Sequence, residues 1–300
     1  MKKFTQKILI FTLSLLVLFT LIILGINILD HHILNKKYSN NNKEIIILGD
    51  SHTETGINDS LDVQLNNISQ ASETYFFTYF KLKNIFSIKK PKKVILGFSP
   101  HNLSFFQDEK TYAINGSERY KDLYPKYFFC LNTSGIKDII SNSNGNLLST
   151  FIPTLKINIK SIIGNENAYI GQYLKSEKSI LDTNLINEKI NIHFYPEGET
   201  VYDISQLQID YIKKINDLCR KNNIEFYLVY MPLHKLYKDK IPSEFNEAYR
   251  EIVNQLKKEG IVHLDYSLID LPDKCFLDGD HLNSFGSEII TLQLLNDLDL

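Results

Sequence analysis

The chain has 300 residues and a formal net charge of −2, so it lacks the basic excess that a nucleic-acid-binding protein carries. Its hydrophobic content of 43% is ordinary for a globular protein, and its length allows one large domain or two small ones. The three cysteines lack the spacing of a metal site and allow at most one intramolecular disulfide, which leaves the pairing of Cys130, Cys219 and Cys275 open.

The first predicted element is an apolar helix over residues 8–29. It contains no charged residue, and as a helix it is about 33 Å long, enough to cross the hydrocarbon core of a membrane. The alternative is a cleaved signal peptide, which has a shorter apolar core and a cleavage site of small residues that 25–30 does not provide. We therefore expect an uncleaved anchor, preceded by a cytoplasmic segment 1–7 and followed by a polar linker 30–43.

Lysines are more frequent before this anchor than after it, a mild bias that favours a cytoplasmic N-terminus. The residues concerned are Lys2, Lys3 and Lys7 before it and Lys36 and Lys37 after it. We therefore predict a single-pass protein of the cell membrane whose domain, residues 44–300, is extracytoplasmic. No other stretch of the sequence is long and apolar enough to span, which argues against a polytopic transporter.

The domain is predicted to begin with a buried strand at 45–48 that runs into Gly49-Asp50-Ser51. In open α/β sheets the chemistry lies at the carboxyl ends of strands, so Ser51 is a candidate nucleophile if a base can reach it. The alternative is that Ser51 only caps the helix that follows. Asp50 is expected to hold the turn by hydrogen bonds.

A helix is predicted at 75–88 and a strand at 94–98, and the pattern then breaks down over residues 103–203. About 100 residues are too many for a single loop in a compact domain, so we interpret this segment as a mostly helical insertion that borders the cleft. Its many Tyr and Phe side chains would either stack on sugar rings or simply pack the insertion.

Strand–helix alternation returns after the insertion and predicts a parallel sheet with helices on both faces, a three-layer α/β/α fold. Just before the last predicted helix lies Asp278-Gly-Asp-His281, which offers a base for Ser51. The predicted elements are a helix at 204–222, a strand at 224–230, a helix at 244–259, a strand at 261–266 and a helix from 283 or 284 to about 295.

Gly49-Asp50-Ser51 and Asp278-x-x-His281, in this order, resemble the SGNH (GDSL-type) hydrolases. The resemblance covers residues 45–300 apart from the insertion, and it implies a flavodoxin-like three-layer α/β/α domain. It further implies Ser51 as nucleophile, His281 as base and Asp278 as the group that orients the imidazole. Asp280 is a competing carboxylate, but as an immediate neighbour of His281 we expect it to point elsewhere.

The blocks that form the oxyanion hole of this family are incomplete here. The family uses the serine N–H, a glycine of a second block and an asparagine of a third block, G-x-N-D. The second block, 67–72, has no glycine, so its donor would be a backbone N–H near Ala71 or Ser72. In the third block Asn102 is the expected side-chain donor, although no Asp follows it.

Three histidines fall at predicted strand ends, and we expect His52, His101 and His234 to contact substrate. Together with Asp50 they could suggest a metal site. However, the sequence has no H-E-x-x-H or comparable close pair, so we expect neither a metal nor another cofactor.

These expectations combine into a serine-dependent enzyme that hydrolyses an acyl ester or transfers the acyl group to a sugar hydroxyl. The substrate would be a cell-envelope glycan or another surface ester, lipid esters included. Two alternatives remain open: a catalytically inactive envelope protein of the same fold that binds glycan, and an accessory subunit of a polytopic membrane acyltransferase.

Overall fold

The computed structural model describes residues 2–39, 42–196 and 200–300. Its centre is a five-stranded sheet in which every pair of neighbouring strands is parallel. The strands lie in the order β2-β1-β3-β4-β5, which is the order of flavodoxin-like doubly wound folds. Their bounds are β1 (Ile45–Leu48), β2 (Leu65–Asn67), β3 (Lys93–Gly97), β4 (Glu225–Tyr230) and β5 (Val262–Asp265).

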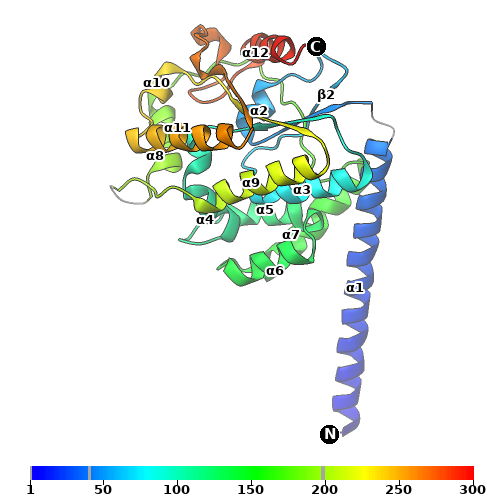
Figure 1. Ribbon diagram of the computed structural model, residues 1–300. Coiled ribbons are helices and arrows are strands. Elements are labelled where there is room, and N and C mark those ends of the chain that lie inside the picture. Colours follow the sequence, from blue (N-terminus) through cyan, green and yellow to red (C-terminus); the bar gives the residue numbers. More distant parts are fainter. Residues whose placement is uncertain (1, 40–41, 197–199) are drawn as a thin grey trace.

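Helices cover both faces of this sheet (Figure 1). One apolar cluster contains Ile46 and Leu48 of β1 together with buried residues of α3 (Tyr75–Ile88), α9 (Gln206–Lys221) and α11 (Ser243–Lys258). The other contains Ile45 and Ile47 with buried residues of α12 (Ser284–Asp297). Because side chains alternate between the two faces of a strand, the unbroken apolar run of β1 supplies both cores. The predicted three-layer α/β/α fold is therefore confirmed.

The segment between β3 and α9 is helical, and the described part of residues 103–203 contains no strand. Tyr127 and Phe194 of this segment are fully buried in the same apolar cluster as α3 and α9, so the segment packs as an extension of the domain core. Its helices are η1 (Pro100–Leu103), α4 (Phe106–Tyr112), α5 (Tyr120–Tyr127), η2 (Phe128–Cys130), α6 (Thr133–Asn142), α7 (Leu147–Ile163) and α8 (Thr183–Phe194).

A single long helix, α1 (Lys2–Ser39), precedes the sheet, and its C-terminal part packs on the domain. Leu34 and Tyr38 are buried in the larger apolar cluster. The buried Asp30 accepts hydrogen bonds from Asn167 Nδ2 at 2.7 Å and from Tyr169 OH at 3.2 Å. Most of the stretch predicted as a polar linker is therefore helix, because its few apolar residues recur at helical spacing and cover one face of the domain.

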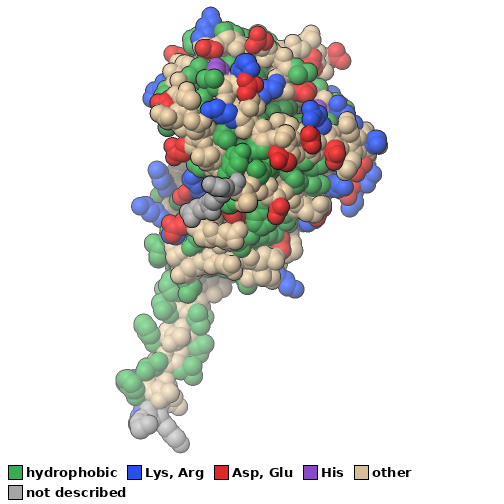
Figure 2. Space-filling model, turned by 90° about the vertical axis from the view of Figure 1, so that its left-hand side faces the viewer, with side chains coloured by type: hydrophobic (Ala, Val, Ile, Leu, Met, Phe, Trp, Pro, Cys, Tyr) green, Lys and Arg blue, Asp and Glu red, His purple; other side chains and the backbone are tan. Residues whose placement is uncertain are grey.

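The N-terminal part of α1 projects from the domain as a stem (Figure 1). By length and composition this helix could cross a membrane, and within the described residues it is the one helix that meets this test. Figure 2 shows hydrophobic side chains along the stem, whereas most charged side chains lie on the body of the domain.

Candidate active site

Ser51 stands at the carboxyl end of β1, as the first residue of the short helix α2 (Ser51–Gly56). The turn before it requires glycine, because Gly49 has φ +137° and a Cβ there would lie 2.5 Å from Thr53 Oγ1. Asp50 caps α2: its Oδ1 accepts the His52 N–H at 3.0 Å. The sequence Gly-Asp-Ser thus builds a tight, capped turn that fixes the direction of the serine hydroxyl.

Ser51, His281 and Asp278 form a continuous hydrogen-bonded chain. Ser51 Oγ lies 2.7 Å from His281 Nε2, and His281 Nδ1 lies 3.0 Å from Asp278 Oδ1. With the ring proton on Nδ1, facing the carboxylate, Nε2 is free to accept the proton of the Ser51 hydroxyl. The structure thus brings together the three residues predicted to be catalytic, with His281 between Ser51 and Asp278.

The Asp278 side chain also shapes the loop that carries the base. Its Oδ1 accepts the backbone N–H of Asp280 at 3.1 Å and that of His281 at 3.0 Å. At Gly279 a Cβ would lie 2.6 Å from Ile186 Cγ1, so α8 packs tightly against this turn. The D-x-x-H spacing therefore lets one carboxylate hold both the backbone and the imidazole of the same turn.

Asp280 points into the site, so the expectation that it points elsewhere is wrong. Its Oδ2 lies 3.4 Å from His52 Nε2 and its Oδ1 lies 3.4 Å from His281 Nδ1. The cause is the tight turn, which reverses the chain between Asp278 and His281 and directs both carboxylates to the same side.

Lys189 of α8 is a site residue that sequence reasoning missed. Its Nζ lies 2.8 Å from Asp278 Oδ2, 2.5 Å from Asp280 Oδ1 and 3.0 Å from His281 Nδ1. The insertion therefore contributes the cation that balances the two carboxylates. The sequence carries only a faint signal for it, a lone lysine between Ile186 and Ile190 on a predicted helical segment.

The local charges tune the protonation of this group. Burial lowers the pKa of His281, but Asp280 and Asp278 outweigh burial and raise that pKa above its ordinary value of 6.5. Burial raises the pKa of Asp278, yet the hydrogen bond and charge of His281 hold it below its ordinary value. Asp278 is therefore ionised at neutral pH, and the two acidic neighbours of His281 make its imidazole more basic than usual.

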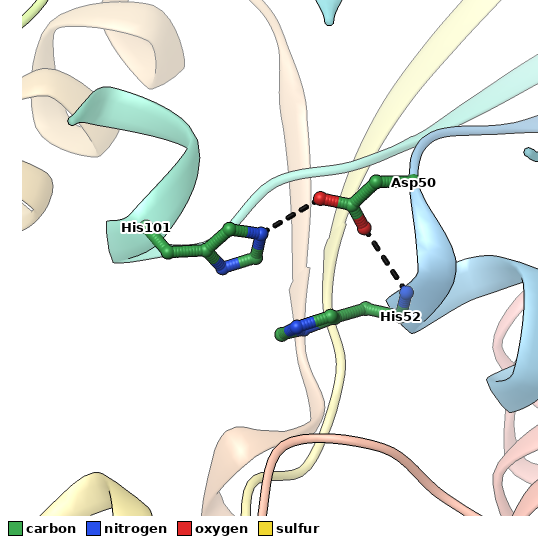
Figure 3. A group of neighbouring side chains, drawn as sticks. All are labelled: Asp50, His52 and His101. Carbon is green, nitrogen blue, oxygen red and sulfur yellow. Dashed lines mark hydrogen bonds and ion pairs between the residues drawn. The ribbon is translucent and has the colours of Figure 1, made fainter. Parts of the chain in front are cut away.

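A second polar network lies behind Ser51 and is centred on Asp50 (Figure 3). His101 Nε2 lies 2.7 Å from Asp50 Oδ2, and His101 Nδ1 lies 2.8 Å from Ser99 Oγ. The ring of His52 lies over that of His101 with a centroid distance of 4.2 Å, and His193 stacks on the other side at 5.1 Å. Asp50 thus holds the turn as predicted, with histidines on two elements as its partners.

His101 and His193 are neutral at physiological pH. Burial, with the adjacent His52, lowers the pKa of His101 to about 4, although Asp50 opposes the shift. Burial likewise lowers the pKa of His193 well below its ordinary value. Burial raises the pKa of Asp50, but His101 and His52 hold it well below its ordinary value, so the carboxylate stays charged.

Two groups of donors here are close enough to bind a cation. The ligand atoms of Asp50, His52 and His101 lie within 4.8 Å of one another, as do those of His52, Asp280 and His281. In the first group, both Asp50 oxygens already accept hydrogen bonds, from the His52 N–H and from His101. In the second group, the Lys189 ammonium is already paired with Asp280. The donor sets therefore fit a hydrogen-bonded and ion-paired network better than a metal site.

The predicted oxyanion donors differ in their placement. Asn102 is withdrawn, because its Nδ2 donates to Asp50 Oδ2 at 2.8 Å and its Oδ1 accepts the Ser99 N–H at 2.9 Å. Ser72, in contrast, lines the same cavity as Ser51 and has φ +65°, a left-handed conformation that glycine favours. The Glu54 carboxylate interacts with the backbone N–H of Ala71. Of the two backbone donors expected in the second block, Ser72 is the one that is among the residues lining this cavity.

Of the three histidines expected to contact substrate, His52 and His101 line the cavity, whereas His234 lies elsewhere. His234 caps the short helix α10 (Lys235–Lys238), where its Nδ1 accepts the Leu236 N–H at 3.2 Å. The backbone N–H of His234 donates to the Gly279 carbonyl at 3.1 Å. His234 therefore supports the loop of His281 from behind.

The cavity beside Ser51 has a volume of about 180 Å³, and it is lined by the basic side chains of Lys110 in α4, Lys189 in α8 and Arg119, which precedes α5. It adjoins an open groove of about 970 Å³, since Phe106, Arg119 and Ile192 line both. A further cavity of about 370 Å³, mostly apolar, shares Lys189 and Ile192 with the chamber beside Ser51. The serine thus faces a polar chamber that adjoins both a large groove and an apolar cavity.

Comparison with known proteins gives one family model that matches residues 199–298, a segment that includes β4, β5 and the 278–281 loop. No curated protein matches the chain. Among solved structures, the chain is similar to a GDSL-like lipase from Bacteroides thetaiotaomicron, with 10% identity, 86% of this chain and 88% of that chain covered, and a TM-score of 0.40.

It is also similar to a proposed acylhydrolase from Bacteroides fragilis, with 11% identity, 88% and 92% of the two chains covered, and a TM-score of 0.41. A third match, a proposed platelet activating factor from Streptococcus pneumonia, has 13% identity, 96% and 98% coverage, and a TM-score of 0.41. All three TM-scores are below 0.5. The fold assignment therefore rests on the strand order of this chain, and the resemblance to SGNH hydrolases rests on its motif residues.

Proposed function

We propose that this protein is a serine-dependent acyl-ester hydrolase or O-acyltransferase of the SGNH type. The observation that carries the proposal is the chain from Ser51 Oγ to His281 Nε2 at 2.7 Å and from His281 Nδ1 to Asp278 at 3.0 Å. This is the constellation that acyl transfer by serine needs, and it lies at the carboxyl end of a central strand, where open α/β sheets bind their ligands.

In the first half of the reaction, Ser51 Oγ attacks the ester carbonyl while His281 Nε2 takes the hydroxyl proton. The tetrahedral oxyanion is held by the backbone N–H groups of Ser51 and Ser72. It collapses to an acyl-enzyme as His281 returns the proton to the leaving alcohol. In the second half, water or a sugar hydroxyl gives its proton to His281 and attacks the acyl-enzyme. The bond from the acyl group to Ser51 Oγ then breaks as His281 returns the proton to that oxygen, which regenerates Ser51 and yields an acid or a new ester.

The surroundings of Ser51 support a glycan ester as the substrate. The adjoining groove, about 970 Å³, carries amide, carboxyl and phenol side chains, among them Glu109, Asn115, Asn191 and Tyr195. The amide, carboxyl and phenol groups can hydrogen-bond sugar hydroxyls, and the phenol ring also stacks on the apolar faces of sugar rings. The apolar cavity near Ile186 and Leu277 would take the acyl chain. Both the sugar and the acyl group would thus have a cavity that adjoins the chamber of Ser51.

The proposal places residues 8–29 in the membrane and the domain, from residue 44 onward, on the extracytoplasmic side. Its support is that α1 is one uninterrupted helix whose C-terminal part is built into the domain, with Leu34 and Tyr38 in the main apolar cluster. Cleavage near residue 25, as for a signal peptide, would leave this buried part as a free chain end. A cell-envelope ester would then be within reach of the site.

One observation favours the non-catalytic alternative, a glycan-binding or accessory envelope protein. Asn102, the side chain expected in the oxyanion hole, is bonded to Asp50 instead. In that case Ser51 would be a hydrogen-bonding residue of a binding site, and its hydroxyl would not react.

Serine reactivity separates the two. The full-length protein in detergent is treated with a fluorophosphonate probe and with p-nitrophenyl acetate, beside Ser51→Ala, His281→Ala and the control Ser60→Ala, which changes an exposed serine outside the site. We expect labelling and turnover to be lost in the first two variants and kept in the control. A folded wild-type protein that is inert to both reagents would refute the enzymatic proposal. Product analysis with a sugar acceptor then distinguishes transfer from hydrolysis.

A further inference from the structure

The outer face of α7 is apolar although nothing in the described structure covers it. Leu148, Ile152, Ile159 and Ile163 are 86%, 67%, 44% and 81% exposed. Their spacing of four, seven and four residues places them on one face of the helix. The face toward the domain is polar instead, since its buried residues are Thr150, Thr154 and Asn158. The usual amphipathic pattern of a surface helix is therefore inverted in α7.

This helix lies against the apolar stem of α1. The rings of Phe19 in α1 and Phe151 in α7 meet edge to face with a centroid distance of 5.6 Å. Ile23 of α1 and Leu155 of α7 line one small apolar cavity. Figure 1 shows α6 and α7 at the end of the domain from which the stem projects. The exposed face of α7 is therefore close to the surface of α1 that is proposed to meet lipid.

The free part of the stem is too short to cross a bilayer alone. Even if the span is counted from Phe4, the first apolar residue after Lys2 and Lys3 and four residues before the predicted span, the helix rises only about 23 Å to Phe19, where α7 begins to flank α1, against a hydrocarbon core of about 30 Å. Even with Lys7 extended toward the cytoplasmic interface, Phe19 would lie about 7 Å inside the outer boundary of the core. The part of α7 at this level must then be in contact with lipid.

The charges on α7 fit the same placement. Lys156 and Lys160 are exposed, and at 100° per residue they fall at the border of the apolar stripe. Lysines at the border of an apolar face are typical of helices that lie in a membrane interface, where the long side chains extend to the headgroups. A protein partner would not account for the shortfall in the length of α1, whereas a bilayer accounts for the stripe, the lysines and that length together.

We propose that α7 lies in the outer interface of the bilayer that α1 crosses, with Leu148, Ile152, Ile159 and Ile163 in contact with acyl chains. The inference rests on the proposed anchoring by α1. It adds a second lipid contact, which seats the domain directly on the membrane with a fixed orientation. A helix in an interface is typically buried by about 5–10 Å, which agrees with the depth derived from the stem.

The absence of tryptophan from the sequence allows a direct test, because each variant then carries a single indole. Ile152→Trp reports on α7. Leu268→Trp replaces a leucine that is 78% exposed in η3 (Tyr266–Leu268), whose Tyr266 packs in the cluster of α12 on the other face of the sheet. Leu13→Trp reports on the stem. Full-length variants are reconstituted in phosphatidylcholine vesicles with and without brominated acyl chains, which quench indole on contact, and circular dichroism checks their fold.

We expect emission from positions 152 and 13 to be blue-shifted and strongly quenched by brominated lipid, and emission from position 268 to be unaffected. Quenching at 13 with a response at 152 equal to that at 268 would overturn the seating of α7 and leave the anchor intact. Loss of quenching at 13 as well would overturn the anchoring on which the inference rests. Neither outcome bears on the serine chemistry, which the fluorophosphonate assay reads separately.

Discussion

Replacement of the two carboxylates near His281, one at a time, tests which of them orients the base. Asp278→Asn keeps an acceptor for the backbone N–H groups at 3.0 and 3.1 Å, so the turn should survive. It removes the charge that stabilises the imidazolium, and it places an amide opposite Nδ1. In serine triads the equivalent change lowers kcat about 10⁴-fold, or about 5 kcal/mol, and we expect a loss of this order.

Asp280→Asn should cost much less. The Asp280 carboxylate lies 3.4 Å from His281 Nδ1 and is already paired with Lys189. Its charge alone should stabilise the imidazolium by about 1–2 kcal/mol, which corresponds to a loss of about 5–30-fold.

The assay is kcat/KM for p-nitrophenyl acetate together with the rate of fluorophosphonate labelling, with circular dichroism to check the fold of both variants. A folded Asp280→Asn variant that loses as much activity as Asp278→Asn, or more, would refute the assignment of Asp278. It would make Asp280 the residue that orients His281.

Three further predictions concern the base, the oxyanion hole and α1. Because His281 must be neutral to act as the base and its pKa is raised, activity should rise with pH through a midpoint above 6.5. Lys189→Met removes a positive charge that lowers this pKa, so it should move the midpoint of the pH profile to higher pH. A shift of the midpoint to lower pH would contradict the assignment of His281 as the base. Ser72→Ala keeps the backbone donor and should retain kcat/KM within about 3-fold, whereas a loss near 100-fold would show that the hydroxyl is needed. Leu34→Ala should lower the free energy of unfolding by about 2–4 kcal/mol in a denaturant titration, and an unchanged midpoint would mean that α1 is not part of the fold.

The sequence was sufficient for four of the five strands, because they are local apolar runs, and for the proximity of Asp278 to His281, because D-x-x-H is a local motif. The approach of Ser51 to His281 was expected only from the resemblance to SGNH hydrolases, since 230 residues separate the two. A run such as Ile45–Leu48 is apolar on both faces, and D-x-x-H places acid and base within one turn. Lys189 could not be predicted, because only tertiary packing of α8 against Gly279 brings it to the site. Asp280 was misjudged since its direction depends on the backbone of that turn.

The same distinction explains the other differences. Asn102 was expected to face a ligand because of its place in a motif, but its partner Asp50 comes from another strand end, 52 residues away. The end of α1 was interpreted as a linker because polar residues dominate 30–43, and the buried contacts of Asp30 involve residues more than 130 positions further along the chain. Composition alone does not reveal such distant partners.

The distance along the chain between Ser51 and His281, 230 residues, has a consequence for the protein during its synthesis. Ser51 leaves the ribosome long before His281, and Lys189, which pairs with Asp278 and Asp280, lies between them in the sequence. Until the last helices have docked, Ser51 is an ordinary alcohol with no neighbour to take its proton. A nascent or partly folded chain would therefore not react with esters, and covalent labelling of Ser51 would report that the whole domain has folded.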